Sequence, residues 1–370
     1  MATQDAAIET PAASVEEFET IVIGGGQAGL AVGYYLKKGG GSFVILDANE
    51  QIGGSWRTRT WSSLRLFTPA RYDGLPGWAF PAPGWSYPTA RETADYLEAY
   101  ADRFQLPVRL GMSVDRLTKV GDRYVVESGG RRFVADRVVV ATGFYGKPSV
   151  PDFAPELDPR IVQMHSSDYR DPSQLLPGGV LLVGAGNSGA DIAIEASATH
   201  RTWLSGPDKG QVPVRIESPL RRLVVPVLWF VASRVLTVKT PLGRKVRPHV
   251  ISGGAPRIRV KTNDLRKAGV ESVPRTVGVH DGLPTLEDGR VMDVANVIWC
   301  TGFRQDFSWI DLPVFEGGSP VHESGVASEP GLYFVGLDFL HAFTSENVGG
   351  VGRDARRIAK HLASQQLRKR

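Results

Sequence analysis

Cysteine is almost absent from this chain of 370 residues. Its one cysteine, Cys300, cannot form an internal disulfide, which excludes a disulfide-stapled scaffold and a redox pair of neighbouring cysteines. The seven histidines are scattered along the chain without the spacing of metal ligands, so we expect no metal site.

The sequence also lacks a hydrophobic run long enough to cross a bilayer. Its longest apolar stretch, residues 223–238, contains Pro226 and Arg234 and falls short of the ~20 residues that a spanning helix needs. The polar N-terminus does not have the basic segment and apolar core of a secretory signal. We therefore expect a cytoplasmic protein without an integral membrane span. The apolar stretch itself could line a substrate channel, form the face of a homodimer or lie on a membrane surface.

Charge of one sign is not strongly in excess, because 43 Lys and Arg stand against 39 Asp and Glu. No basic stripe alternates with aromatic residues, so a nucleic-acid partner is not expected. Glycine is the residue in excess, at 42 of 370 against a usual ~7%. Without a Gly-X-Y repeat, this excess indicates glycine-rich turns.

The first such turn lies between a short apolar run at residues 20–23 and a helix predicted from about residue 27 to residue 38. It fits the GxGxxG pattern with Gly24, Gly25, Gly26, Gln27, Ala28 and Gly29. The strand predicted next ends at Asp47, where a carboxylate can bind an adenosine ribose. In this pattern the first glycine allows the turn, the second admits a pyrophosphate, and the third lets helix and strand pack closely. The context predicts a dinucleotide site.

The same pattern recurs after the apolar run at residues 180–183, with Gly184, Gly186, Asn187, Ser188 and Gly189. Here the following strand, residues 201–205, ends at Ser205 instead of an acidic residue. Arg201 and Lys209 lie nearby in the sequence, and Asp208 opposes them. The missing acid and the available cations predict a ribose 2′-phosphate, and therefore NADP rather than NAD.

Two dinucleotide sites in one chain imply a flavin and a nicotinamide cofactor, with FAD at the first site. The predicted fold is α/β, with two Rossmann-like dinucleotide-binding domains, the second inserted into the first. We expect a disordered tail at 1–18, an FAD-binding domain at 19–150 and 300–370, and an NADP-binding domain at 151–299. A Thr-x-x-Glu capping box starts a helix predicted at 90–104, and another helix is predicted at 351–362.

Several short strings resemble the flavin-containing monooxygenases of class B, especially their short bacterial and plant-type members. Gly53-Gly54-Ser55-Trp56 is similar to their flavin-contacting Gly-Gly-x-Trp. Ala141-Thr142-Gly143 and Thr301-Gly302 resemble the two hinges between their domains. Residues 164–169, with His165 and Tyr169, resemble the second half of the motif that identifies the family, although Pro159 and Ile161 replace the Phe and Gly of its first half. The resemblance covers about residues 20–362.

The resemblance implies an enzyme that uses NADPH and FAD to insert one oxygen atom from O2 into a small organic substrate, through a flavin C4a-hydroperoxide. It also implies FAD contacts at Gly54, Ser55, Trp56, Val114, Ala141, Thr142, Gly143 and Asp338. No catalytic residue follows from it directly, and the candidates are His165, Tyr169 and Thr68. Thr68 lies in Leu66-Phe67-Thr68-Pro69, where animal-type members carry an Asn.

Three questions stay open at the level of sequence. The enzyme could be an NADPH oxidase, or a ferredoxin- or quinone-type flavin reductase that inserts no oxygen. A flavin-binding regulator is the alternative that is not an enzyme. The substrate is not readable, and neither is the choice between N- or S-oxygenation, Baeyer–Villiger oxidation and oxidative decarboxylation. Tyr169, where Baeyer–Villiger relatives carry Trp, argues against ketone oxidation.

Overall fold

A computed structural model describes residues 15–143, 145–216, 218–251 and 256–369. Most of the tail expected at 1–18 lies outside these residues. The end of that tail is a correction, because residues 15–18 already belong to strand β1 (Val15–Ile23). They pair with residues 132–135 of the neighbouring strand, and Glu16 forms a salt bridge with Arg109 at 2.6 Å. Polar side chains alone had suggested disorder, whereas the backbone continues a sheet.

The strands form two large sheets and three small pairs. The first sheet contains β1, β2 (Phe43–Leu46), β3 (Val108–Arg109), β4 (Arg116–Val120), β5 (Arg123–Ser128), β6 (Arg131–Val140), β18 (His322–Glu323), β19 (Val326–Ala327) and β20 (Leu332–Phe334). The second contains β8 (Val162–His165), β9 (Val180–Val183), β10 (Thr202–Ser205), β11 (Glu271–Val273) and β14 (Asn296–Trp299). The pairs are β7 (Lys147–Pro148) with β15 (Phe303–Arg304), β12 (Thr276–His280) with β13 (Leu283–Leu286), and β16 (Phe315–Glu316) with β17 (Ser319–Pro320).

Among the described residues the α-helices are α1 (Gln27–Gly39), α2 (Gly54–Thr58), α3 (Ala90–Arg103), α4 (Asn187–Ala196), α5 (Arg221–Phe230), α6 (Pro241–Ile251), α7 (Thr262–Lys267) and α8 (Val351–Lys369). A π-helical turn, η4 (Val231–Val235), continues α5. Short 3-10 turns are η1 (Ala70–Tyr72), η2 (Ala154–Glu156) and η3 (Pro172–Gln174). The predicted capping box starts α3, where Thr89 Oγ1 accepts from the Glu92 amide at 3.1 Å.

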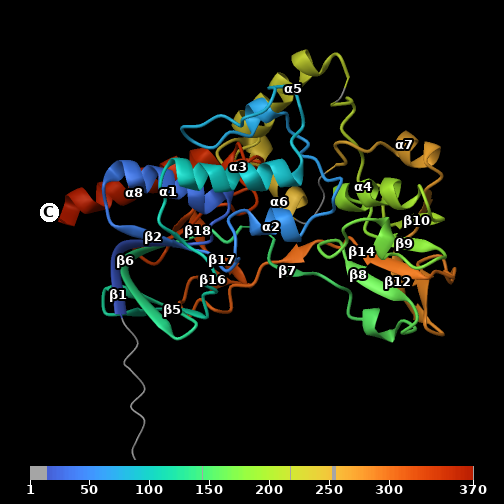
Figure 1. The fold of residues 1–370 in the computed structure, drawn as a ribbon, viewed down its shortest axis with the longest axis horizontal. Helices are drawn as coiled ribbons and strands as arrows, with labels where there is room; N and C mark the ends of the chain where they lie inside the picture. The colour runs from blue at the N-terminus through green and yellow to red at the C-terminus, as the bar shows by residue number, and fades with distance from the viewer. Residues whose placement is uncertain (1–14, 144, 217, 252–255, 370) are drawn as a thin grey trace, which may run out of the picture.

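In the first sheet, β20, β6, β1, β2 and β3 are parallel neighbours, and the antiparallel hairpin β4–β5 attaches to β6. Alternate residues of β1 point to opposite faces. Val22 packs in the core beneath α1, α3 and α8, and Ile21 and Ile23 pack in the core on the side of β4–β5. Figure 1 shows these three helices lying together along one face of the sheet.

The second sheet is parallel throughout, in the order β11-β10-β9-β14-β8. All its strands lie between residues 162 and 299, and strands of the first sheet precede and follow that range. Each sheet thus has a strand, a glycine turn and a helix in succession, which confirms the predicted α/β class with two Rossmann-like units. The domain boundaries at 150 and 300 stay a prediction.

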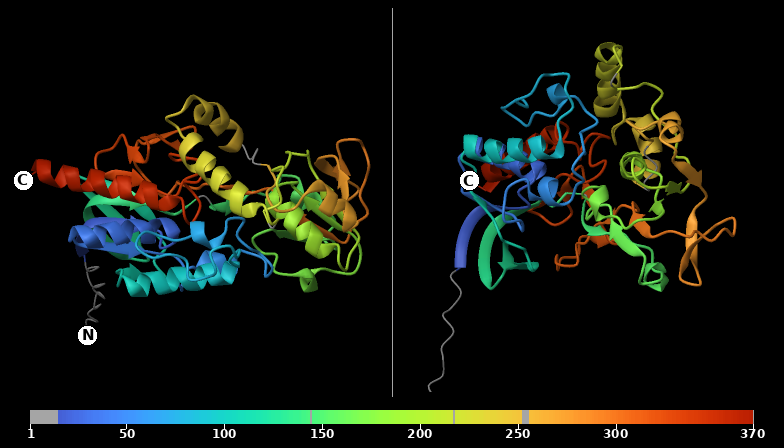
Figure 2. Two further views of the ribbon diagram at one scale, coloured as in Figure 1. Left: turned by 90° about the horizontal axis from the view of Figure 1, so that it is seen from above. Right: turned by 45° about the vertical axis from the view of Figure 1, so that its right-hand side comes forward.

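Two chain segments connect the sheets side by side. They pair as β7 and β15, and the Ser149 amide donates to the Gly302 carbonyl at 2.9 Å. A second link comes from α5, η4 and α6, which leave the second sheet and reach toward the first, as the left view of Figure 2 shows. There Thr237 forms an antiparallel bridge with Ala342. No helix within the described ranges is both long and apolar enough to cross a membrane.

Candidate functional site

The first glycine loop joins β1 to α1, and its three pattern glycines meet different surroundings. Gly24 has a φ of +108°, and a Cβ there would lie 2.5 Å from the Ala141 carbonyl oxygen. A Cβ on Gly29 would lie 1.8 Å from the Gly24 carbonyl oxygen. At Gly26 a Cβ would meet no described atom within 4 Å. The fold itself therefore requires Gly24 and Gly29, whereas Gly26 borders open space.

Asp47 lies directly after β2, as predicted, and its carboxylate is held in one orientation. One oxygen accepts from the Gly25 amide, and the other accepts from the Asn49 amide at 2.8 Å and the Asn49 side chain at 2.7 Å. The Met112 amide donates to the Asp47 carbonyl at 2.8 Å, which brings the segment before Val114 beside this carboxylate. These contacts fix a buried acid next to the glycine loop.

Three distant segments meet at the start of α1. Trp56 Nε1 donates to Gln27 Oε1 at 3.3 Å, and Gln27 Nε2 donates to the Glu346 carbonyl at 3.2 Å. Gly336, which follows β20, lies so close to Ala28 that its Cβ would come within 2.7 Å of the Ala28 Cβ. Gly54 and Ser55 begin α2, the helix that carries Trp56, with Gly54 buried and Ser55 exposed.

Two carboxyl groups beside this region have pKa values above their usual range. Burial, reinforced by the nearby Asp338 carboxylate, raises the pKa of Glu346 to about 8. Burial also raises the pKa of Asp338, and Arg247 of α6 acts in the opposite direction. These raised pKa values favour the neutral, protonated forms of both carboxyl groups.

Thr68 is hydrogen-bonded to a buried acid: its Oγ1 donates to Asp73 Oδ1 at 2.5 Å. Asp73 is only 1% exposed, and its second oxygen finds no donor among the residues that the structure describes. Burial raises the pKa of Asp73 to about 7, against the lowering effect of the Thr68 hydrogen bond. Sequence reasoning missed Asp73 because nothing local marks its carboxyl as buried.

Asp73→Asn should stabilise the protein more at high pH than at low pH. The folded state holds the Asp73 proton more tightly than the unfolded state, whose ordinary pKa is 3.8. The parent therefore loses up to roughly 4 kcal/mol of unfolding free energy as pH rises from about 4 to about 7, and the loss is constant above that. Thermal melts of D73N and the parent across this range measure the difference. Asp122→Asn, at an exposed site, is the control, and a difference that does not change with pH would contradict the assignment.

The second glycine loop, between β9 and α4, repeats the geometry of the first. Gly184 has a φ of +116°, and its Cβ would lie 2.3 Å from the Cys300 carbonyl oxygen. A Cβ on Gly189 would lie 1.9 Å from the Gly184 carbonyl oxygen. At Gly186 it would again meet no atom of the described chain within 4 Å. Asn187 and Ser188 form the first turn of α4 beside this opening.

The sequence predicted that Ser205 and Arg201 would line this opening, but their side chains have other partners. Ser205 is buried, and its hydroxyl donates to the Pro274 carbonyl at 2.9 Å. Arg201 precedes the amino end of β10, whereas the glycine loop lies at the carboxyl ends of the parallel strands. It forms a salt bridge with Glu271 at 3.0 Å. The structure therefore does not bring Arg201 to the dinucleotide loop, and only exposed Lys209 lies on the loop that follows β10.

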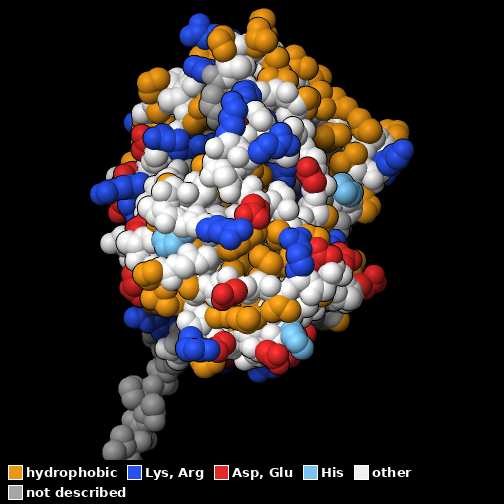
Figure 3. Space-filling model, turned by 90° about the vertical axis from the view of Figure 1, so that its right-hand side faces the viewer, with side chains coloured by type: hydrophobic (Ala, Val, Ile, Leu, Met, Phe, Trp, Pro, Cys, Tyr) orange, Lys and Arg blue, Asp and Glu red, His pale blue; other side chains and the backbone are white. Residues whose placement is uncertain are grey.

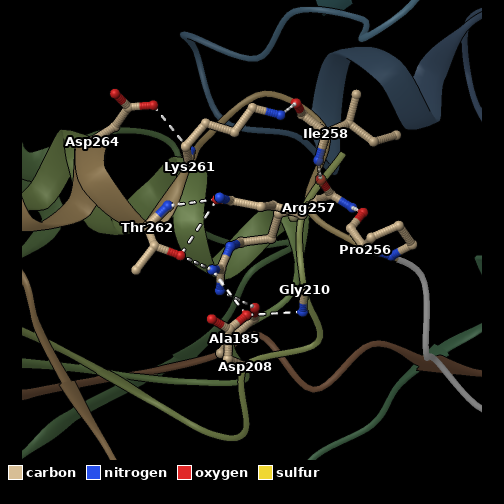
Figure 4. Close-up of polar contacts among 11 residues, drawn as sticks. Ala185, Asp208, Gly210, Pro256, Arg257, Ile258, Lys261, Thr262 and Asp264 are labelled. Carbon is tan, nitrogen blue, oxygen red and sulfur yellow. Dashed lines mark hydrogen bonds and ion pairs between the residues drawn. The ribbon is translucent and has the colours of Figure 1, made fainter. Parts of the chain in front are cut away.

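Arg257, instead of Arg201, is the arginine that contacts the second glycine loop. One Nη of Arg257 donates to the Ala185 carbonyl at 3.4 Å, and the other donates to Asp208 at 3.1 Å and to Thr262 at 2.8 Å (Figure 4). The side chain is 4% exposed, and its Nε finds no acceptor among the described residues. A buried guanidinium with a spare donor beside a glycine loop suits a phosphate.

Asn187 of the second motif positions Arg257. Its Oδ1 accepts from the Ile258 amide at 2.8 Å, and its Nδ2 donates to the Pro256 carbonyl at 3.3 Å. The Arg257 amide also donates to the Gly210 carbonyl at 3.0 Å, which ties it to the loop after β10. The sequence analysis missed Arg257, because no motif surrounds it and its neighbour Ala185 lies 72 positions away.

His165 connects the second sheet to the hinge. The Ser167 amide donates to its Nδ1 at 3.1 Å, so we assign the proton to Nε2, which donates to the Gly302 carbonyl at 2.9 Å. Burial lowers the pKa of His165, against the raising effect of this hydrogen bond. His165 is therefore a neutral positioning residue between the second sheet and the hinge.

Tyr169 and the hinge glycines complete the junction. Tyr169 is fully buried in the core under α4, and burial raises the pKa of its hydroxyl well above the usual value. The Ala141 amide donates to the Ile23 carbonyl at 2.7 Å, after which Thr142 and Gly143 leave the first sheet, with Gly143 at a φ of +79°. Gly302 has a φ of +81° on the returning segment. Both connections thus change direction at a glycine.

Comparison with known proteins agrees with this arrangement. Residues 21–206 match the family described as pyridine nucleotide-disulphide oxidoreductase. An uncharacterized CzcO-like oxidoreductase of Geobacillus kaustophilus is 39% identical over 340 residues, covering 91% of this chain and 96% of that protein. The probable indole-3-pyruvate monooxygenase YUCCA3 of Arabidopsis thaliana is 28% identical, with 93% and 86% covered. The structure of a flavin-containing monooxygenase from Stenotrophomonas maltophilia has a TM-score of 0.76 at 31% identity, with 95% and 99% covered.

Two glycine loops, each at the carboxyl end of a parallel strand in its own sheet, and a hinge between the sheets define a flavin-dependent oxidoreductase with a pyridine-nucleotide site. The chain belongs to the pyridine nucleotide-disulphide oxidoreductase family. Its resemblance to the flavin-containing monooxygenases is confirmed. Cys300 is the only cysteine of the chain, so it cannot form an internal dithiol pair, and burial raises the pKa of that thiol to about 12.

Proposed function

We propose that this protein is an NADPH-dependent FAD monooxygenase that transfers one oxygen atom from O2 to a small organic substrate. The observation that carries the proposal is the pair of open positions at Gly26 and Gly186. Each is the second glycine of its pattern, the one that a pyrophosphate approaches, and each borders space that the described chain leaves open. FAD, when bound, supplies electron transfer from NADPH to O2.

The residues around the first loop fit FAD. The N–H groups at the start of α1 face the pyrophosphate position, and Asp47 is held ready for a ribose hydroxyl. Trp56, Gln27 and the Glu346 segment surround the same end of the helix. We retain Val114, Thr142, Gly143 and Asp338 as proposed FAD contacts.

The residues around the second loop fit NADPH. Ser205 replaces the acid that would repel a 2′-phosphate, and Arg257 reaches the loop from the next segment with its Nε unpaired among the described residues. Lys209 lies on the exposed turn beyond Asp208. His165 holds the second sheet against the hinge, and this contact would help to keep the two bound cofactors together and water away from them.

Arg257→Gln should raise the KM for NADPH by about 10- to 100-fold, since a charged hydrogen bond contributes roughly 1.5–3 kcal/mol. The KM for NADH, which has no 2′-phosphate, should change by less than about twofold. Steady-state kinetics with both cofactors test this, and Arg201→Gln is the matched control at the far end of β10. An equal rise for both cofactors would show that Arg257 acts on the fold instead of the phosphate.

The reaction itself is tested by following oxygen atoms. A panel of small amines, sulfides, ketones and 2-oxo acids is incubated with the FAD-loaded protein, NADPH and ¹⁸O2, and products are examined by mass spectrometry. A product that carries one ¹⁸O atom supports the proposal. NADPH consumption with stoichiometric H2O2 and no labelled product would instead indicate an oxidase. Transfer of electrons only to ferredoxin or a quinone would indicate a reductase, and failure of NADPH to reduce the flavin would favour a regulator.

A further inference from the structure

The outer face of α5 carries an exposed apolar stripe. Leu220, Leu223, Val227 and Phe230 follow one another at spacings of three and four residues, so they lie on one side of the helix. Their exposed fractions are 61, 72, 60 and 59%. Leu242 at the start of α6 is also 49% exposed. We call these five residues the apolar stripe.

The opposite side of α5 packs on the unit that contains the first sheet. Val225 is buried, and the Trp229 ring stacks on Tyr72 with ring centroids 5.1 Å apart. The Val238 amide donates to the His341 carbonyl at 2.9 Å, just beyond the end of η4. The stripe therefore cannot turn inward without breaking these contacts, and it stays presented to the outside.

The charged residues of the chain segment that carries the stripe are all positive. Residues 218–263 contain no Asp or Glu. Within 218–251 there are seven basic residues: Arg221, Arg222, Arg234, Lys239, Arg244, Lys245 and Arg247. Figure 1 places α5 at the end that projects away from both sheets. At the top and upper right of the face drawn in Figure 3, hydrophobic side chains gather with Lys and Arg side chains beside them.

We propose that α5 and α6 dock on the surface of a membrane that contains anionic lipids. The apolar stripe would enter the headgroup boundary while the five exposed basic side chains of this segment, Arg222, Arg234, Lys239, Arg244 and Lys245, meet lipid phosphates. With 10 residues, α5 is too short to span the bilayer and lies along it. This proposal is independent of the reaction, because it needs neither cofactor nor turnover.

A second copy of the chain fits this face less well. In a two-fold dimer the same patch meets itself, so its five exposed cations would face the same five cations without a carboxylate from the same segment. A substrate channel also fits poorly, because the stripe residues are 49–72% exposed and point outward. An anionic surface is the partner that satisfies both the apolar area and the charge.

The test is flotation of the FAD-loaded protein with lipid vesicles. Binding should be strong on vesicles that contain phosphatidylglycerol and weak on phosphatidylcholine alone. It should also fall between ~0.05 M and ~0.5 M salt, as screening of basic side chains requires. Leu223→Glu with Val227→Glu should weaken partitioning at least about tenfold, because a carboxylate cannot enter the apolar boundary of an anionic surface. Arg244→Gln with Lys245→Gln should reduce binding to anionic vesicles only.

Two control pairs match these variants in exposure. Val120→Glu with Val277→Glu introduces the same charges at apolar residues that are 61 and 52% exposed elsewhere, and Arg131→Gln with Arg132→Gln removes two exposed cations of β6. Both pairs should bind vesicles as the parent does. Equal loss in test and control pairs, or binding that ignores lipid charge, would overturn the proposal. So would a parent that stays off vesicles while the stripe variant converts a dimer to a monomer in light scattering.

Discussion

Substituting Gly26 with valine should give a folded protein that purifies without flavin. A Cβ at this position meets nothing within 4 Å in the described chain, and the backbone φ of −76° suits any residue. The valine methyl groups would therefore cost the fold little. They would occupy the space through which a pyrophosphate must approach the loop backbone. We expect flavin occupancy below about a tenth of the parent's, because close backbone approach is what this glycine allows.

The measurement is the ratio of flavin absorbance to protein absorbance after purification, with circular dichroism to check the fold. Gly278→Val is the matched control, since a Cβ on this β12 residue likewise meets no described atom within 4 Å. Gly29→Ala gives the opposite pattern. Its Cβ would lie 1.8 Å from the Gly24 carbonyl oxygen, so the protein should misfold regardless of cofactor. A yellow Gly26→Val protein with full flavin content would refute the placement of FAD at the first loop.

The parts of the structure that the sequence predicted well are those that depend on local chemistry. A short apolar run, a glycine turn and an amphipathic helix define each βα unit within about 20 residues. The structure explains why glycine recurs at positions 24 and 184. In each turn a Cβ would collide with the carbonyl oxygen of a neighbouring segment. The capping box of α3 and the buried face of α8 are local patterns of the same kind.

The parts that the sequence missed depend on strand direction and on distant neighbours. Arg201 lies near the second motif in sequence, but parallel strands bring only their carboxyl ends to the ligand edge, and Arg201 precedes the amino end of β10. Arg257 reaches that edge from a segment whose path no local pattern predicts. Asp73 looks like an ordinary loop acid until packing buries it. The site residues stay predictions, and Arg257 and Lys209 are now the proposed contacts of the 2′-phosphate at the second loop.

Substituting Gly186 with valine should impair NADPH binding and leave FAD binding intact. The Gly186 backbone has a φ of −79°, and its Cβ would meet no described atom within 4 Å, so the fold and the first loop should be unaffected. The variant should therefore purify yellow. NADPH should no longer bleach it at the parent's rate, because the methyl groups block the loop that the nicotinamide cofactor's pyrophosphate approaches.

We expect the rate of flavin reduction at fixed, subsaturating NADPH to fall at least about 100-fold, as lost charged hydrogen bonds of roughly 3 kcal/mol require. Anaerobic stopped-flow absorbance measures this rate. Dithionite, which needs no protein site, should bleach parent and variant alike, and this comparison isolates the loss to NADPH binding. Gly278→Val again serves as the control for fold and flavin content. If Gly186→Val is reduced by NADPH as fast as the parent, the second loop is not the NADPH site, and electrons reach the flavin by another route.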